Sequence, residues 1–407
     1  MLNIVYGRKS NSMSRILVLG APIFQVEVIK KAKELGNYVG AIDINADAPA
    51  FPYADECFVC SIRDYEGVLK IAKDFKPDGI LIGACDTSVV TGARICQTLG
   101  LPGHTVDTAI KSTDKVKMLE VFQEHDVAHP LFQVIKKDSV LTISNDIAYP
   151  LITKPTDSAG GRGVCIVHNE EELSKAVEFS SNAGQSGDVL IEEYMKGPEV
   201  SVEMIIVDGI PYVLQITDKI TSGEPNFFEI GHSQPSVLPL NIKERITELA
   251  CKAVKAVGLR DSPAHIEIII TDKGPRMVEL GARLGGDCIT SYLIDESVIG
   301  INMTEATIKL CLGIKPDVTQ FSNSGVCSAV RFIPAKEGTL KGITGEKEAE
   351  ALMGVKKICI TGKIGKHYSD ATDDSARFGY VVCVGNSTEE ALQRCQNAIN
   401  TIRFELE

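Results

Sequence analysis

The stretch AHIEIIITDKGPRMVELGARLGG, residues 264–286, decides how the rest of this sequence is interpreted. Two apolar runs flank a turn at Lys273, which predicts a hairpin of two antiparallel strands. Glu267 and Glu279 are equally far from Lys273 along the chain, and alternate residues of a strand share a face. We therefore expect the two carboxylates to face each other on one side of the hairpin.

These opposed carboxylates suggest a metal site. Like charges on neighbouring strands repel each other unless a cation lies between them, and Mg²⁺ prefers hard oxygen ligands that it shares with substrate phosphates. Arg283 continues the alternation beyond Glu279, toward any anion held by the metal. The alternative is a solvated surface. Alternating isoleucines bury one face of the first strand, however, and leave unusual polarity on the other, so we favour the metal site.

A glycine-rich loop follows the strand that contains Lys154. Residues 157–163 read DSAGGRG, and the backbone N–H groups of such a loop can approach an anion closely. The loop lies between two strands and no Gly-Lys-Ser/Thr follows it, which excludes a Walker A loop. An ordinary flexible hairpin explains the glycines equally well, so the loop alone leaves both interpretations open.

The segment EEYM, residues 192–195, is followed by Gly197 and Glu199. A strand of this kind suits adenine, because its backbone groups can read the edge of the base while apolar side chains cover the ring. Glu199 could accept hydrogen bonds from ribose hydroxyls. An edge strand with an acidic outer face is the simpler alternative.

The region from Ile16 to Gly83 alternates short apolar strands with helical spacing, which predicts a parallel sheet with right-handed crossovers. The turn at Gly20 lacks GxGxxG, so a nicotinamide site is not expected. Asp86 ends a buried strand, where it could contact substrate or, more commonly, cap a helix. Near the other end of the chain, residues 369–377 have the composition of a disordered segment.

Length and composition indicate a multidomain globular protein. The chain has 407 residues, 24% of them charged, and a formal net charge of −12, so it offers little to a nucleic-acid backbone. No apolar run approaches the roughly 18 residues of a membrane span, and the short polar stretch 1–15 lacks the apolar core of a signal peptide. Twelve scattered cysteines fit reduced thiols, which favours the cytoplasm.

The hairpin, the glycine-rich loop and the EEYM strand, in this arrangement, resemble the ATP-grasp superfamily over nearly the whole chain. The sequence is most similar to the carboxylate–amine ligase branch, especially the L-amino acid ligases. It shares its plan with biotin carboxylase, the carbamoyl-phosphate synthetase large chain and phosphoribosylglycinamide synthetase. The resemblance implies an α/β ATP-grasp fold. A leader at 1–15 would precede a parallel-sheet domain at 16–110. The nucleotide domain would span 111–325, with a small lobe at about 115–195 and a large lobe at about 196–325, and a closing α+β module would span 326–407.

The resemblance also implies roles for individual residues. Arg283 would bind the acyl phosphate or the substrate carboxylate, and Lys219 would be a phosphate-binding cation. His232 would steer the amine, although an exposed histidine is an equally ordinary explanation. Glu267 and Glu279 would bind one or two Mg²⁺ ions. The residues that would hold ATP are Lys115, Lys154, Ser158, Gly160, Gly161, Arg162, Gly163, Glu192, Glu193, Tyr194, Met195 and Glu199.

Gly281 departs from the family pattern, which usually has Glu-x-Asn-x-Arg at this strand. The second Mg²⁺ would lose one oxygen ligand, so water or bridging by Glu279 must compensate. The departure bears on the geometry of the second metal and separates the chain from biotin carboxylase, which keeps the Asn.

The expected activity is ATP-dependent joining of a carboxylate, an amino acid or small acid, to an amine through an acyl phosphate. The alternatives are a purine-biosynthesis enzyme of the same superfamily, such as phosphoribosylamine–glycine ligase or a bicarbonate- or formate-activating relative, and a non-catalytic ATP-binding protein. ATP and Mg²⁺, with Mn²⁺ as a substitute, are the expected cofactors. The expected partners are small molecules rather than nucleic acid or membrane, and homodimers are common among relatives.

Overall fold

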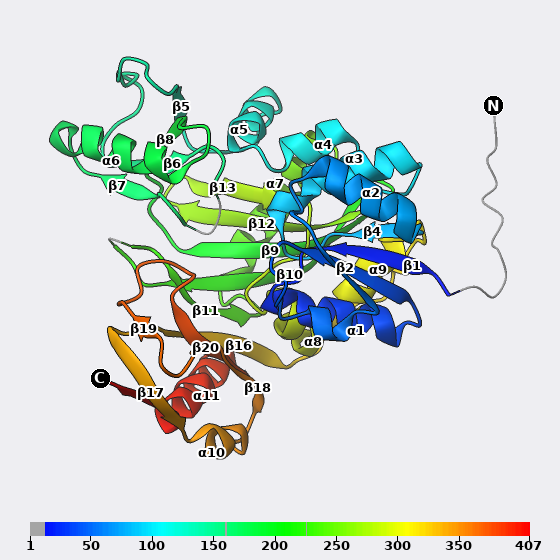
Figure 1. Ribbon diagram of the computed structural model, residues 1–407. Coiled ribbons are helices and arrows are strands. Elements are labelled where there is room, and N and C mark those ends of the chain that lie inside the picture. Colours follow the sequence, from blue (N-terminus) through cyan, green and yellow to red (C-terminus); the bar gives the residue numbers. More distant parts are fainter. Residues whose placement is uncertain (1–12, 159–160, 225) are drawn as a thin grey trace, which may run out of the picture.

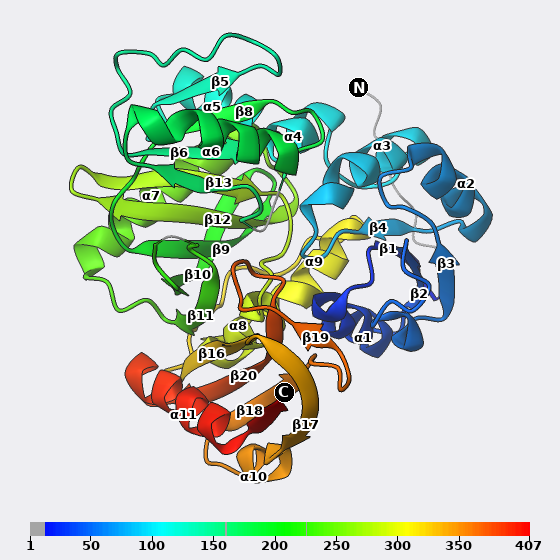
Figure 2. The same ribbon diagram turned by 60° about the vertical axis from the view of Figure 1, so that its left-hand side comes forward.

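The computed structural model describes residues 13–158, 161–224 and 226–407 (Figure 1). The elements form three groups: the leading sheet with its helices, a small antiparallel sheet, and a large sheet that continues into the C-terminal elements (Figure 2). Within the described ranges, no helix has both the length and the apolar character needed to cross a membrane.

The leading part is a parallel sheet, as predicted. Its strand order is β3-β2-β1-β4 and every pairing is parallel. The strands are β1 (Arg15–Leu19), β2 (Tyr38–Asp43), β3 (Glu56–Val59) and β4 (Gly79–Leu81), and the helical segments are η1 (Ile23–Gln25), α1 (Val26–Glu34), η2 (Phe51–Tyr53), α2 (Tyr65–Phe75), η3 (Asp86–Ser88), α3 (Val89–Leu99) and α4 (Val106–Lys111).

The small lobe is a four-stranded antiparallel sheet in the order β5-β8-β6-β7. The glycine-rich loop joins β6 to β7, so it connects two strands as expected. The elements are α5 (Lys115–Glu124), β5 (Phe132–Ile135), β6 (Leu151–Pro155), β7 (Cys165–Val167), α6 (Glu170–Ala183) and β8 (Val189–Glu193).

The large sheet has eight strands in the order β13-β12-β9-β10-β11-β16-β20-β18. Its strands are β9 (Glu199–Val207), β10 (Ile210–Thr221), β11 (Glu229–Gln234), β12 (Ser262–Thr271), β13 (Gly274–Gly281), β16 (Cys327–Pro334), β18 (Val355–Ile360) and β20 (Arg377–Gly385). β11 pairs with β16 from Gly231↔Arg331 to Gln234↔Ser328. Hydrogen bonding therefore continues across the predicted boundary at residue 326, and the C-terminal part shares a sheet with the large lobe.

Other elements complete the large lobe and the C-terminal part. A three-stranded sheet in the order β19-β17-β21 and helix α11 lie at the C-terminal end (Figure 1). These elements are α7 (Leu240–Val257), η4 (Ile289–Leu293), α8 (Ile294–Ser297), β14 (Val298–Ile299), α9 (Met303–Cys311), β15 (Ser322–Asn323), β17 (Gly338–Thr344), α10 (Glu346–Glu350), β19 (His367–Tyr368), α11 (Thr388–Thr401) and β21 (Arg403–Leu406).

The two faces of the β12–β13 hairpin have different environments. Ile266 and Ile268 are fully buried in the same core cluster as Ile246 and Ala250 of α7. Full burial of one such isoleucine contributes about 1.5–3 kcal/mol. Because side chains alternate along a strand, this packing directs Glu267 to the opposite face, away from α7.

Candidate active site

Glu267 and Glu279 are paired residues on β12 and β13, as predicted, but the geometry differs from the expected one. The turn is centred between Asp272 and Lys273, because Thr271 pairs with Gly274. A regular hairpin with that centre would place Val278 opposite Glu267. A β-bulge next to Glu267 shifts the register by one residue and brings Glu279 opposite it.

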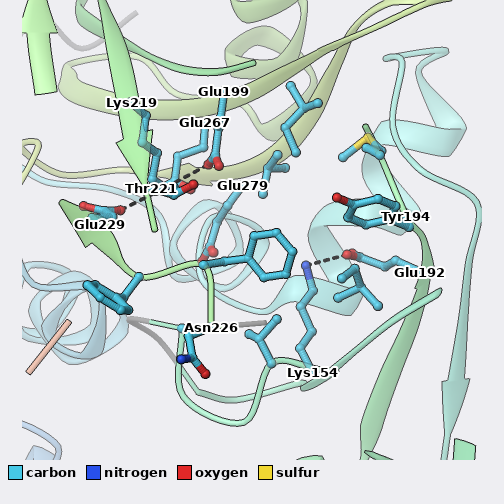
Figure 3. A pocket seen from close by; sticks show the side chains of 18 of the residues that line it. Lys154, Glu192, Tyr194, Glu199, Lys219, Thr221, Asn226, Glu229, Glu267 and Glu279 are labelled. Carbon is cyan, nitrogen blue, oxygen red and sulfur yellow. Dashed lines mark hydrogen bonds and ion pairs between the residues drawn. The ribbon is translucent and has the colours of Figure 1, made fainter. Parts of the chain in front are cut away.

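A cavity of about 390 Å³ lies between the small lobe and this hairpin (Figure 3). We call it the large cavity; its size falls in the range of small-molecule sites. Most of the predicted nucleotide and metal residues line it: Lys115, Lys154, Ser158, Gly161, Arg162, Glu192, Glu193, Tyr194, Met195, Glu199, Lys219, Glu267 and Glu279. Apolar side chains, including Ile152, Val164, Ile269 and Val278, make up another part of its wall.

The Lys219 ammonium is surrounded by carboxylates (Figure 3). Its Nζ lies 2.8 Å from Glu199 Oε1, 2.9 Å from Glu229 Oε1 and 3.1 Å from Glu267 Oε2. Burial by itself lowers the pKa of Lys219, but the three carboxylates raise it well above its ordinary value. Burial raises the pKa of Glu199 to about 7 despite this lysine. Lys219 was predicted to bind phosphate, and here it holds acidic side chains together.

The two lysines predicted to bind phosphates also face carboxylates. Lys115 Nζ lies 2.6 Å from Glu279 Oε2. Lys154 Nζ lies 2.7 Å from Glu192 Oε2 (Figure 3). Glu192 is 5% exposed, and its Oε1 has no hydrogen-bond partner among the described residues. Both ammonium groups border the large cavity, so an anion there would find cations within reach.

A second cavity of about 170 Å³, the inner cavity, adjoins the large one, because four residues line both: Glu229, Glu267, Glu279 and Asp374. Its remaining lining residues are Ala84, Asp86, Ser201, His232, His265, Arg283, Gly286, Asp287 and Ile289. Six of the thirteen carry carboxylates, and only Ala84 and Ile289 are aliphatic. The inner cavity is therefore polar, and carboxylates are the most common side chains in its wall.

Asp86 of the leading domain holds Arg283 in the inner cavity. Arg283 donates from Nε to Asp86 Oδ1 and from Nη2 to Asp86 Oδ2, both at 2.8 Å. Asp86 begins η3, whose N-cap is Cys85, so the alternative that Asp86 caps a helix is wrong. A Cβ on Gly281 would lie 3.0 Å from both Asp86 Oδ1 and Arg283 Nε. The absence of a side chain at Gly281 thus leaves room for this interdomain ion pair.

His265 lies between two carboxylates. Its Nδ1 is 2.5 Å from Glu203 Oε1 and its Nε2 is 3.4 Å from Glu267 Oε1. Burial lowers the pKa of His265, but Glu203 and Glu267 more than offset this and raise it to about 10. Glu203 is fully buried, and a Cβ on Gly285 would come within 2.7 Å of its Oε2. His265 is thus a buried cation behind Glu267.

Four linked charged residues of the site, Glu229, Asp287, Asp374 and Arg377, were not predicted from the sequence. Asp287 Oδ1 lies 2.7 Å from Arg377 Nη1, whose Nη2 also contacts Asp374 Oδ1 at 3.0 Å. Asp374 in turn accepts from the backbone N–H of Glu229 at 2.7 Å. Segment 369–377, which was expected to be disordered, contributes two of these residues. Only Asp287, directly after Arg-Leu-Gly-Gly, had a sequence signal that could have found it.

Some predicted residues lie elsewhere. His232 is 1% exposed and its Nε2 donates to Glu229 Oε2 at 3.0 Å, so the exposed-histidine alternative is wrong. His232 lines the inner cavity with Arg283. Gly163 lines neither cavity, and a Cβ there would meet Ala183 Cβ of α6 at 2.5 Å. Gly160 lies outside the described residues.

The donor set fits a divalent cation. Glu267 and Glu279 offer carboxylate oxygens from adjacent strands, their side chains are 22% and 31% exposed, and both line the two cavities. Their charges are met by lysine ammonium groups, which a hard cation with oxygen preference could replace. These two residues could therefore hold Mg²⁺ beside a phosphate in the large cavity.

Comparison with known proteins agrees with this geometry. Residues 147–291 match the ATP-grasp domain, and residues 331–407 match the L-amino acid ligase C-terminal domain 2. The chain is 27% identical to alanine–anticapsin ligase of Bacillus subtilis over 283 residues, 62% of this chain but only 58% of that ligase.

Two further relatives match over nearly the whole length. A formate-dependent phosphoribosylglycinamide formyltransferase of Sulfurisphaera tokodaii is 25% identical over 407 residues, 95% of this chain and 96% of the other. The crystal structure of an L-amino acid ligase from Bacillus licheniformis superimposes with a TM-score of 0.83 at 21% identity, covering 98% of this chain and 100% of that one. The expected ATP-grasp fold is confirmed: residues 147–291 form an ATP-grasp domain, residues 331–407 match an L-amino acid ligase C-terminal domain, and the relatives of the chain are ATP-dependent ligases of the ATP-grasp family.

Proposed function

We propose that this chain is an ATP-dependent ligase that joins a carboxylate, such as an amino acid or another small acid, to an amine through an acyl phosphate, with release of ADP and phosphate. The observation that carries the proposal is that the two cavities adjoin and share four lining residues, Glu229, Glu267, Glu279 and Asp374. A nucleotide in the large cavity and an acid in the inner cavity would meet at these side chains.

The residues around the large cavity suit ATP. Lys115 and Lys154 would exchange their carboxylate partners for phosphates, and Glu267 with Glu279 would hold Mg²⁺. Bound Mg²⁺ neutralises the charge that develops on a transferring phosphoryl group. The loop that contains Arg162 would exclude water, which otherwise hydrolyses the activated acid.

The residues around the inner cavity suit the second half of the reaction. Arg283, fixed by Asp86, would orient the carboxylate that becomes activated. Positioning of this kind can supply several kcal/mol of the barrier, because reacting groups no longer need to find each other. The six carboxylates of the inner cavity favour an ammonium group, which is the protonated form of the amine.

A purine-type reaction is the second candidate, because the full-length relative from Sulfurisphaera tokodaii acts, by its name, on a phosphoribosyl compound. The inner cavity argues against it. Six of its thirteen lining residues are acidic, so a doubly charged substrate phosphate would meet stronger repulsion there than the single charge of a carboxylate that Arg283 orients. We therefore favour unphosphorylated acids and amines.

A phosphate-release screen tests the proposal. Each amino acid and a set of small carboxylates would be incubated with ATP and Mg²⁺, with and without amines, beside glycine plus phosphoribosylamine, bicarbonate, and formate plus phosphoribosylglycinamide. Phosphate release that needs both an unphosphorylated acid and an amine, with a condensed product by mass spectrometry, is the expected result. Release only with a phosphoribosyl substrate or bicarbonate would establish the second candidate instead.

A further inference from the structure

Asp287 is a carboxylate of the inner cavity that the proposed reaction does not yet use. It follows Gly286 directly and lines the same cavity as Glu267 and Arg283. Its φ is +49°, and that of Cys288 is +69°. Two consecutive non-glycine residues in the left-handed region are costly, and such strain concentrates at functional sites. The backbone here is held in a turn that keeps this carboxylate at the cavity wall.

Charged and titratable groups face Asp287 from several elements. Arg377 of β20 lies 2.7 Å away, and ligand atoms of Glu229 and His232 of β11 lie within 4.8 Å of an Asp287 oxygen. Arg377 also forms an ion pair with Asp374. The Cys288 thiol belongs to the next residue along the chain. Burial and then Glu229 raise the pKa of Asp287 to about 7, although Arg377 lowers it.

The other carboxylates of the inner cavity are less suited to accept a proton. Two are the proposed metal ligands. Asp86 is bound at both oxygens by Arg283, and its pKa is lowered because this arginine outweighs the effect of burial. Glu229 has a pKa well below its ordinary value, since Lys219 overcomes its burial. Burial raises the pKa of Asp374 as well, but its Oδ1 accepts from two donors, the backbone N–H of Glu229 and Arg377.

We propose that Asp287 is the general base of the ligation, an inference that rests on the proposed function. The amine enters the acidic cavity as R′–NH₃⁺ and gives one proton to the Asp287 carboxylate. The neutral nitrogen then attacks the acyl carbon of R–CO–OPO₃²⁻, and the C–O bond to phosphate breaks. The nitrogen loses a second proton to the departing phosphate, giving R–CO–NH–R′ and HPO₄²⁻. Asp287 returns its proton to solvent, so charge and atoms balance.

The test compares two nucleophiles in wild type and Asp287→Asn. One is the amine selected by the phosphate-release screen, which is protonated at neutral pH. The other is hydroxylamine, which is largely unprotonated there and traps the activated acid as a hydroxamate. A general base typically contributes 10²–10⁴-fold, so kcat/KM for the amine should fall about 100-fold or more. Hydroxamate formation should change only a few-fold, because activation of the acid does not need Asp287.

Controls separate this role from a structural one. Asp295 is another aspartate whose burial raises its pKa, to about 6, but it binds Asn302 and lines neither cavity. Asp295→Asn should keep both reactions. In wild type, kcat/KM for the amine should increase with pH through about 7, whereas hydroxamate formation should lack that step. This comparison remains available if Asp287→Asn fails to fold.

The outcomes are distinct. Equal losses with both nucleophiles in Asp287→Asn, or a wild-type pH step that is the same for both, would overturn the role of Asp287 and leave the ligase proposal intact. Wild-type protein that consumes no ATP with any acid, and forms no hydroxamate, would overturn both proposals.

Discussion

Replacement of His265 by leucine tests the ion-pair chain behind the hairpin. The variant leaves Glu203, which is fully buried, without its partner at 2.5 Å. Removal of one member of a buried ion pair costs about 3–5 kcal/mol. The pKa of His265 gives a similar figure, because its rise from 6.5 to about 10 corresponds to roughly 5 kcal/mol.

Thermal unfolding by circular dichroism measures this loss. For a chain of 407 residues, the specific entropy of unfolding converts 3–5 kcal/mol into a Tm decrease of about 4–6 °C. The matched control is the double variant Glu203→Gln/His265→Leu. It carries no unpaired charge, so it should regain most of the lost stability. All measurements would be made in EDTA, so that metal binding does not contribute.

The same ion pair predicts a pH dependence with a definite sign. The folded pKa of His265, about 10, lies above its ordinary value of 6.5. Its contribution is therefore complete below pH 6.5 and is lost as the pH rises toward 10. The Tm difference between wild type and His265→Leu should shrink over this window, because neutral His265 leaves Glu203 unpaired in wild type as well. A decrease of under about 1 °C for His265→Leu at pH 6.5, or no recovery in the double variant, would refute the reasoning.

Three other substitutions probe the cavities. Glu279→Gln should lower kcat about 100-fold or more while retaining ADP affinity by calorimetry; unchanged turnover would contradict a metal role. Gly281→Ala inserts a Cβ 3.0 Å from Asp86 Oδ1 and Arg283 Nε, which would displace the arginine proposed to orient the acid. KM for the acid should therefore rise more than KM for ATP. An equal rise in both would count against the acid site. Lys154→Met should weaken ADP binding about tenfold, consistent with loss of one charge-assisted contact, whereas unaltered affinity would place the phosphates elsewhere.

Much of the architecture follows from sequence patterns. The alternating strands and helices after Ile16 predict the parallel sheet, because a crossover connection between parallel strands needs a helix of that length. The isoleucines of β12 determine which face packs on α7 and therefore which face carries Glu267. These features are local, since they depend on periodicity within one or two elements.

The details of the site are not local. The β-bulge at Glu267 decides that Glu279, rather than Val278, faces it, although the sequence suggested the same pair from a different turn centre. Asp86 and Arg283 are 197 positions apart and meet only because the leading sheet packs beside the hairpin. Arg377 reaches Asp287 because β16 and β20 extend the large sheet beyond residue 326.

By itself, the sequence determined the types of element, the buried face of the hairpin and thirteen of the 27 residues that line the large cavity. The tertiary structure decided the composition of the inner cavity, because its residues come from the leading domain, the large lobe and the C-terminal part. The physical reason is that side-chain periodicity is set by neighbours along the chain, whereas charge pairing and pKa depend on distances across it. Those distances exist only once separate elements have packed together.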